Sequence, residues 1–134
     1  MKILFVCRAN IGRSQIAEAF FNKLSKKHKA ISAGAQVDED NGKVLIEPKV
    51  IEPMKEIGFD ISKNKQKQVT QKMIKEADKI ICMAKKEELP DYLKKSNKLI
   101  FWKVENAKGK DYAFHCKIRD QIKKKVEELV KEIG

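Results

Sequence analysis

The chain has 134 residues, 30 Lys plus Arg against 19 Asp plus Glu, a net charge of +11 and 42% hydrophobic residues. That length fits one domain, residues 1–134, which can bury a hydrophobic core without disulfides or a structural metal. No apolar run approaches the ~20 residues that cross a bilayer, and residues 1–14 lack the pattern of a signal peptide. We therefore expect a cytoplasmic protein that does not enter a membrane.

The cysteines and the basic residues argue against several kinds of site and partner. Cys7, Cys82 and Cys116 are an odd number without CxxC spacing and are accompanied by two His, so we expect no zinc site, no disulfide framework and no cofactor. The basic residues are 27 Lys and three Arg, spread along the chain. A positive surface favours anionic partners, but no RNA-binding aromatic motif or helix-turn-helix accompanies it, so we do not expect nucleic-acid binding.

Short β-rich runs alternate with amphipathic helices along the chain. We predict strands over 2–6, 29–32, 78–83 and 98–102. We predict helices from Ser14, an expected N-cap, to about 27, from Pro48 or Pro53 to Gly58, from Thr70 to Glu76, over 87–93, and from Phe114 to Ile133, with a loop over 36–47. Strands separated by helices imply an α/β fold with a parallel sheet covered on both faces, whose ligands bind beyond the carboxyl ends of the strands.

The loop after the first strand, Cys7-Arg8-Ala9-Asn10-Ile11-Gly12-Arg13-Ser14, carries the chemistry. Unpaired N–H groups at a helix start attract anions, and a thiol in that field ionises readily. The planar guanidinium of Arg13 can hold two oxygens of a tetrahedral oxyanion. The plainer interpretation, a buried Cys7 beside a solvated Arg13, suits a lone cysteine better than this full set. A Walker-type loop would need a Gly-Lys-Ser/Thr ending, which is absent.

These residues resemble the low-molecular-weight protein tyrosine phosphatases and the related thioredoxin-coupled arsenate reductases, whose signature is Cys-x5-Arg-Ser. Further matches are 15–18, 32–34, 58–62, Ala77-Asp78, Trp102 and Arg119-Asp120. The resemblance implies a single-domain, flavodoxin-like, doubly wound four-stranded parallel sheet and catalysis through a phosphocysteine on Cys7. It also implies that Arg13 and the loop residues Arg8, Ala9, Asn10, Ile11 and Gly12 hold phosphate. Asn10 would maintain the loop, and Ser14 would stabilise the Cys7 thiolate.

The chain departs from this family where the general acid is expected. Spacing from Trp102 places Asn106-Ala107 where the family has Asp-Pro, and an amide cannot deliver a proton as a carboxylic acid does. Glu105 is the candidate substitute and Asp111 a more distant one. A solvated Glu105 without a catalytic role is an equal alternative, which would leave a phosphate- or phosphoprotein-binding module lacking the general acid.

Other departures bear on the substrate. Ala9 and Gly12 stand where the family often has Gly and a second Cys, and residues 36–47 contain no aromatic side chain. Tyr112 is the nearest aromatic in the acid-loop region. We therefore expect either a phosphorylated protein or a small phosphate ester as substrate. An arsenate reductase is the alternative enzyme, and its thiol relay would have to use Cys82 and Cys116, although we expect Cys116, like His28 and His115, to be structural.

Overall fold

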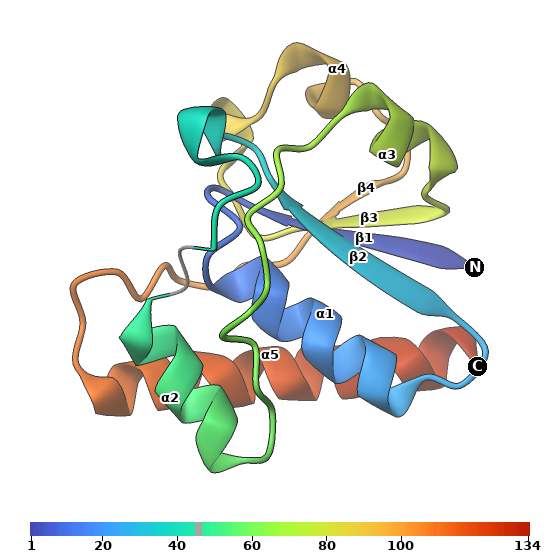
Figure 1. The fold of residues 1–134 in the computed structure, drawn as a ribbon. Helices are drawn as coiled ribbons and strands as arrows, with labels where there is room; N and C mark the ends of the chain where they lie inside the picture. Colours follow the sequence, from blue (N-terminus) through green and yellow to red (C-terminus); the bar gives the residue numbers. More distant parts are fainter. Residues whose placement is uncertain (45–46) are drawn as a thin grey trace.

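The computed structural model describes residues 1–44 and 47–134. Its centre is a four-stranded sheet in the order β2-β1-β3-β4, in which every neighbouring pair is parallel (Figure 1). The strands are β1 (Lys2–Cys7), β2 (Lys29–Gly34), β3 (Lys79–Cys82) and β4 (Leu99–Phe101). The chain passes from β1 outward to β2 and then back to β3 on the other side of β1. The carboxyl end of β1 therefore lies at the topological switch point, where such sheets bind ligands.

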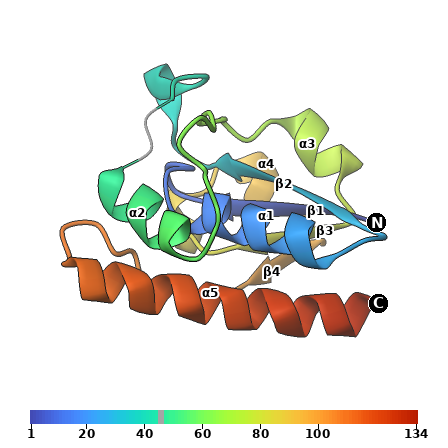
Figure 2. The same cartoon turned by 60° about the horizontal axis from the view of Figure 1, so that its bottom comes forward.

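Helices cover both faces of the sheet. The core residues of α1 (Arg13–Leu24), α2 (Pro48–Glu56) and α5 (Tyr112–Ile133) form one cluster on one face, and α5 runs along the outside of that layer (Figure 2). The short α3 (Gln71–Glu76) and α4 (Asp91–Lys94) lie on the other face (Figure 1). Two 3-10 turns, Asp38–Asp40 and Lys86–Glu88, complete the described elements.

The side chains of β1 point alternately to the two faces of the sheet, and the core is thereby divided into two parts. Ile3 and Phe5 pack with α1 and α5, whereas Leu4 and Val6 pack on the side of α3 and α4. All four are fully buried, as expected for the central strand of a parallel sheet. Burying each such side chain contributes about 1.5–3 kcal/mol, so the loop that follows β1 starts from a firmly held strand.

The predicted fold class is confirmed, and the differences are local. Helix α1 begins at Arg13, with Gly12 as its N-cap, so the prediction that Ser14 caps the helix is wrong: the Ser14 side chain is buried among loop residues. Helix α2 begins at Pro48 and includes Pro53. The helix predicted over 87–93 is instead two short pieces, because Pro90 favours extended backbone at Leu89. Of the loop predicted over 36–47, residues 45–46 lie outside the described residues.

Thr70 and Asp111 begin their helices by accepting backbone hydrogen bonds. Thr70 Oγ1 accepts from Met73 N at 3.2 Å, as predicted for α3. Asp111 Oδ1 accepts from Phe114 N at 2.9 Å and caps α5, which begins at Tyr112, two residues before the predicted start at Phe114. A cap of this kind stabilises a helix by about 1 kcal/mol. It also fixes where the side chains of the first α5 turns point.

Candidate active site

Cys7 is the last residue of β1, and α1 begins six residues later at Arg13. The intervening loop is held from behind by the segment after β2. Ala35 N donates to the Cys7 carbonyl at 2.8 Å, and Gln36 N donates to the Arg8 carbonyl at 2.7 Å. A Cβ on Gly34 would come within 2.8 Å of the backbone of both Ala9 and Asn10. Glycine at position 34 therefore allows this close approach.

Asn10 organises the interior of the loop. It is fully buried, with φ 57°, the left-handed conformation that Asn tolerates better than most residues. Its Oδ1 accepts from Lys67 N at 3.0 Å. Because a backbone N–H can only donate, that contact fixes the orientation of the amide, and Nδ2 must face Ser14 Oγ at 2.8 Å and Ser32 Oγ at 3.0 Å.

This orientation determines what Ser14 can do for Cys7. Ser14 Oγ accepts the amide proton of Asn10, so its own hydroxyl proton is free to point at Cys7 Sγ, 2.9 Å away. Asn10, Ser14 and Cys7 thus form a chain of hydrogen bonds in which the Ser14 hydroxyl is able to donate to the sulfur.

Arg13 lies in the first turn of α1, and its side chain reaches across to the ends of two other strands. Its Nη1 donates to the carbonyl of Met83, just after β3, and to the Val104 carbonyl, after β4, at 2.9 Å. Within the described residues, Nε and Nη2 make no hydrogen bond. They leave the planar edge of the guanidinium available for the two oxygens of an anion. Arg8, by contrast, points outward, where Nε pairs with Glu88 at 3.3 Å.

A cavity of about 600 Å³ opens beside this loop. Its walls come from the loop, from the start of α2, from the segment before α5 and from α5 itself. Its lining residues are Cys7–Ala9, Ile11–Arg13, Ile16, Glu47–Val50, Asn106–Gly109, His115 and Ile118. Most of the lining surface is apolar, with Ile11, Ile16, Val50 and Ile118 among the residues that supply it. An oxyanion bound at the loop would therefore have apolar surface beside its organic part.

The structure places the candidate general acids, Glu105 and Asp111, at different positions relative to the cavity. Asn106 lines the cavity, whereas Glu105 is exposed and lines a neighbouring groove that Asn106 also borders. Asp111 caps α5 and is not among the residues that line either depression. The hydroxyl of Tyr112 donates to Glu56 at 3.0 Å, so this aromatic side chain is held away from the cavity. Glu105 is the sequence neighbour of Asn106, and it borders the groove that is connected to the cavity. It is therefore the acidic candidate that lies nearest to the position of the general acid.

His115 is a cavity residue that sequence reasoning missed. Its Nε2 is buried without a hydrogen-bond partner in the described structure. Burial, together with the positive charge of Lys49, lowers the pKa of His115 below its ordinary value. No ligand-like spacing marks this histidine in the sequence. His115 lies in the cavity wall because of where the first turns of α5 are placed, and only the three-dimensional structure shows that placement.

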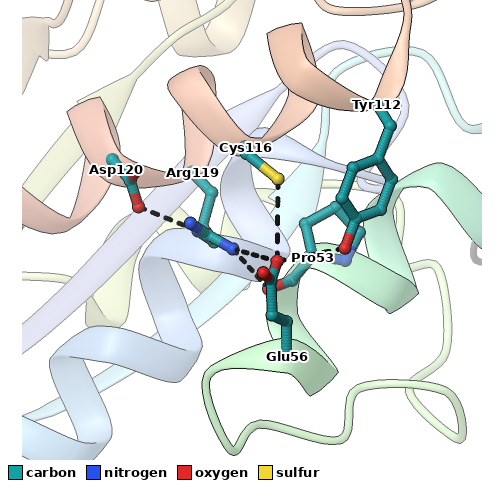
Figure 3. A network of polar contacts seen from close by, with 6 residues as sticks. All are labelled: Pro53, Glu56, Tyr112, Cys116, Arg119 and Asp120. Atoms are coloured by element: carbon teal, nitrogen blue, oxygen red, sulfur yellow. Dashed lines mark hydrogen bonds and ion pairs between the residues drawn. The ribbon is translucent and has the colours of Figure 1, made fainter.

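The other two cysteines lie apart. Cys82 is fully buried on the α3 and α4 side of the sheet, and burial raises its pKa to about 11. Cys116 lies on α5, on the opposite side, with Sγ 3.8 Å from Glu56 Oε2 (Figure 3). Both are free thiols. The sheet therefore lies between the two cysteines that a relay would need.

Comparison with known proteins matches this architecture to one family. The profile of the family "Low molecular weight phosphotyrosine protein phosphatase" matches residues 2–134. Arsenate reductase 2 of Staphylococcus epidermidis is 30% identical over 131 residues, covering 93% of this chain and 92% of that protein. The low molecular weight protein tyrosine phosphatase of T. tengcongensis superposes with TM-score 0.85 at 27% identity, covering 98% and 99% of the two chains.

A solved arsenate reductase in its phosphate-binding state superposes with TM-score 0.83, also at 27% identity, covering 99% of this chain and 98% of that chain. The chain belongs to the low molecular weight phosphotyrosine protein phosphatase family. It is therefore an enzyme of a family whose chemistry runs through a cysteine, with phosphatases and arsenate reductases among its relatives.

Proposed function

We propose that the chain hydrolyses phosphate monoesters through a phosphocysteine on Cys7. The observation that carries the proposal is the chain of hydrogen bonds that links Asn10, Ser14 Oγ and Cys7 Sγ, beside a guanidinium with an open edge. A nucleophilic thiolate needs a donor that stabilises it and an electrostatic cradle for the transferred group. The phosphate-binding residues in this proposal are Arg8, Ala9, Asn10, Ile11, Gly12 and Arg13.

The reaction has two steps. In the first, Cys7 Sγ attacks phosphorus, the bond from phosphorus to the leaving oxygen breaks, and Glu105 gives that oxygen a proton. In the second, water attacks phosphorus, the S–P bond breaks, Glu105 takes the proton of the water, and phosphate leaves. Ser14 donates to the sulfur as it departs, and Arg13 holds the phosphoryl oxygens in both steps.

The substrate is a phosphorylated protein or a small phosphate ester, and the setting is the cytoplasm. Three free thiols fit a reducing compartment. Within the described residues, no helix has the length and apolar character needed to cross a bilayer.

The alternative enzyme is an arsenate reductase, favoured by the 30% identity to an arsenate reductase over most of both chains. Arsenate and phosphate are both tetrahedral oxyanions, so the same cradle suits either. The third candidate, a phosphate- or phosphoprotein-binding module, is motivated by Asn106 in the cavity wall, where a proton donor is expected.

Hydrolysis of para-nitrophenyl phosphate as a function of pH tests the proposal. We expect turnover by the unmodified chain and none by Cys7→Ser. Removing a general acid typically lowers the rate by ~10²–10⁴-fold, so a loss of that size in Glu105→Gln assigns the acid to Glu105. A gain of similar size in Asn106→Asp, with Glu105→Gln unchanged, would show that the acid is missing. Phosphate binding without turnover would favour the binding module.

A further inference from the structure

A second depression continues from the candidate active site. It encloses about 1030 Å³ and lies at the carboxyl ends of β3 and β4, between these ends and the first turns of α5. We call it the lysine groove; its lining residues are Arg8, Arg13, Met83–Lys86, Glu88, Phe101–Asn106, Phe114, Lys117, Ile118 and Gln121. Because Arg8, Arg13 and Asn106 line both depressions, a molecule bound at Cys7 can extend into the groove.

Positive charge dominates the groove. Four exposed lysines, Lys85, Lys86, Lys103 and Lys117, line it, and none makes an ion pair within 4 Å among the described residues. Glu88 is already engaged by Arg8 and by the backbone N–H of Lys85. Six cationic side chains therefore face two acidic ones, Glu88 and Glu105, in this depression. Unpaired charges of one sign in a concave surface attract ligands of the opposite sign.

Aromatic side chains form the apolar part of the same groove. Phe101, on the edge strand β4, is 47% exposed, and Trp102 and Phe114 are half-buried. Exposed aromatic rings beside cations are typical of surfaces that bind polypeptides. A small phosphate ester would fill the cavity next to Cys7 and leave this surface unused.

We propose that the lysine groove binds the acidic polypeptide segment that flanks the phosphorylated residue of a protein substrate. The proposal rests on the phosphatase function proposed above and narrows its substrate class to acidic phosphoproteins. Lys103 and Lys117 both line the groove, one after β4 and one on α5. They are placed to contact acidic side chains of a segment that lies in it.

The test compares two phosphopeptides of equal length with the same phosphorylated residue, one flanked by Glu and one flanked by Lys, and uses para-nitrophenyl phosphate as the reference. We expect kcat/KM to favour the acidic peptide by about tenfold or more at low salt. In Lys103→Glu/Lys117→Glu, the loss on the acidic peptide should exceed the loss on para-nitrophenyl phosphate at least about fivefold. The preference should fall steeply in about 0.5 M salt, which screens exposed charges.

A matched control separates the groove from the overall charge. Lys26→Glu/Lys27→Glu changes the net charge equally, at exposed residues before β2, at the opposite end of the strands from Cys7. We expect this variant to keep the peptide preference. Equal losses in the two double variants, or equal kcat/KM for the two peptides, would overturn the proposal.

If the unmodified chain shows no turnover, peptide binding to the Cys7→Ser variant still tests the inference. Fluorescence anisotropy should show tighter binding of the acidic peptide, weakened by Lys103→Glu/Lys117→Glu and not by the control. Lack of turnover would then count against the proposed function alone. A single-stranded RNA that binds in the groove with the same sensitivity to these variants, while neither peptide binds, would overturn the inference in favour of nucleic acid.

Discussion

Asn10 combines a strained backbone with a fully satisfied side chain. Its left-handed φ costs of order 1–3 kcal/mol in a non-glycine residue. Its amide donates to Ser14 and Ser32 and accepts from Lys67 N and from Gln15 Nε2, the last at 3.0 Å. Four hydrogen bonds in a buried setting offset the strain, and they hold the loop in the form that places Ser14 against Cys7.

Two substitutions separate these roles. Asn10→Gly keeps the backbone conformation and removes the hydrogen bonds, whereas Asn10→Ala also adds strain. We expect Asn10→Ala to lower the free energy of unfolding by about 2–4 kcal/mol, with Asn10→Gly losing less. Urea denaturation measures both. If Asn10→Gly matches the unmodified chain in stability and in kcat, the hydrogen-bond chain is not needed.

His115 gives a pH dependence with a defined sign. Burial and the nearby Lys49 lower its pKa in the folded chain, although Asp111, Glu47 and the Ala107 carbonyl act in the opposite direction. Below about pH 6.5, the ordinary value, the unfolded chain binds the proton more readily than the folded chain. The stability that this histidine contributes is therefore present above that pH and is lost as the pH falls toward its folded value.

Urea denaturation between pH 8 and pH 5 checks this expectation. The unmodified chain should lose more stability on acidification than His115→Gln, because glutamine does not titrate. His28 is present in both proteins, so it cancels in the difference. Parallel pH profiles for the two proteins would mean that His115 does not have a lowered pKa.

At the scale of elements, α2 and α5 are joined by a polar network that fixes two walls of the cavity. Arg119 is buried, and its Nη1 donates to the Pro53 carbonyl at 2.8 Å and to Glu56 at 3.1 Å (Figure 3). Its Nε donates to Asp120 at 2.8 Å. The same α2 supplies Pro48–Val50 to the cavity, and α5 supplies His115 and Ile118. A shift between the helices would therefore change the shape of the cavity.

We predict that Arg119→Ala destabilises the chain by about 2–4 kcal/mol, because it leaves a buried carbonyl unpaired and opens a space. It should also raise KM more than it lowers kcat, since it loosens the cavity walls and leaves the loop intact. Glu56→Gln is the control: its carboxylate is exposed, so the loss of stability should be smaller than in Arg119→Ala. Thermal unfolding and steady-state kinetics measure both effects. Equal losses in the two variants would contradict the central role of Arg119.

The elements and the loop were predictable from the sequence to different degrees. Strand and helix positions follow from local hydrophobic periods, and the approach of Cys7 to Arg13 follows from their spacing on one loop. The positions of the cavity walls cannot be predicted in this way, because Pro48–Val50 and His115 reach the site only through the packing of α2 on α5. Ser14 was misplaced as a cap because the competing partners, Asn10 and Cys7, become its neighbours only when the loop folds back.

At the scale of the whole molecule, the sheet separates Cys82 from Cys116. Cys7 faces the cavity at the end of β1. Cys82 belongs to the core on the side of α3 and α4, and Cys116 lies on the α5 side. Reduction of arsenate needs two electrons, which two thiols supply when they join in a disulfide. A disulfide between Cys82 and Cys116 requires Cα atoms within about 7 Å, and the sheet between them prevents that approach without large rearrangement.

The consequence is a prediction about Cys82. A thiol with a pKa raised to about 11 is almost entirely protonated at neutral pH and a weak nucleophile. We expect Cys82→Ala to leave hydrolysis of para-nitrophenyl phosphate within about twofold of the unmodified chain, at a stability cost of about 1 kcal/mol from the lost packing. Any arsenate turnover supported by dithiothreitol should likewise persist in Cys82→Ala and disappear in Cys7→Ser, because the external dithiol supplies the second thiol. Loss of arsenate turnover in Cys82→Ala, with phosphatase activity retained, would instead mean that the chain opens far enough for the buried cysteine to take part. The separation of thiols by the sheet would then describe the resting state alone.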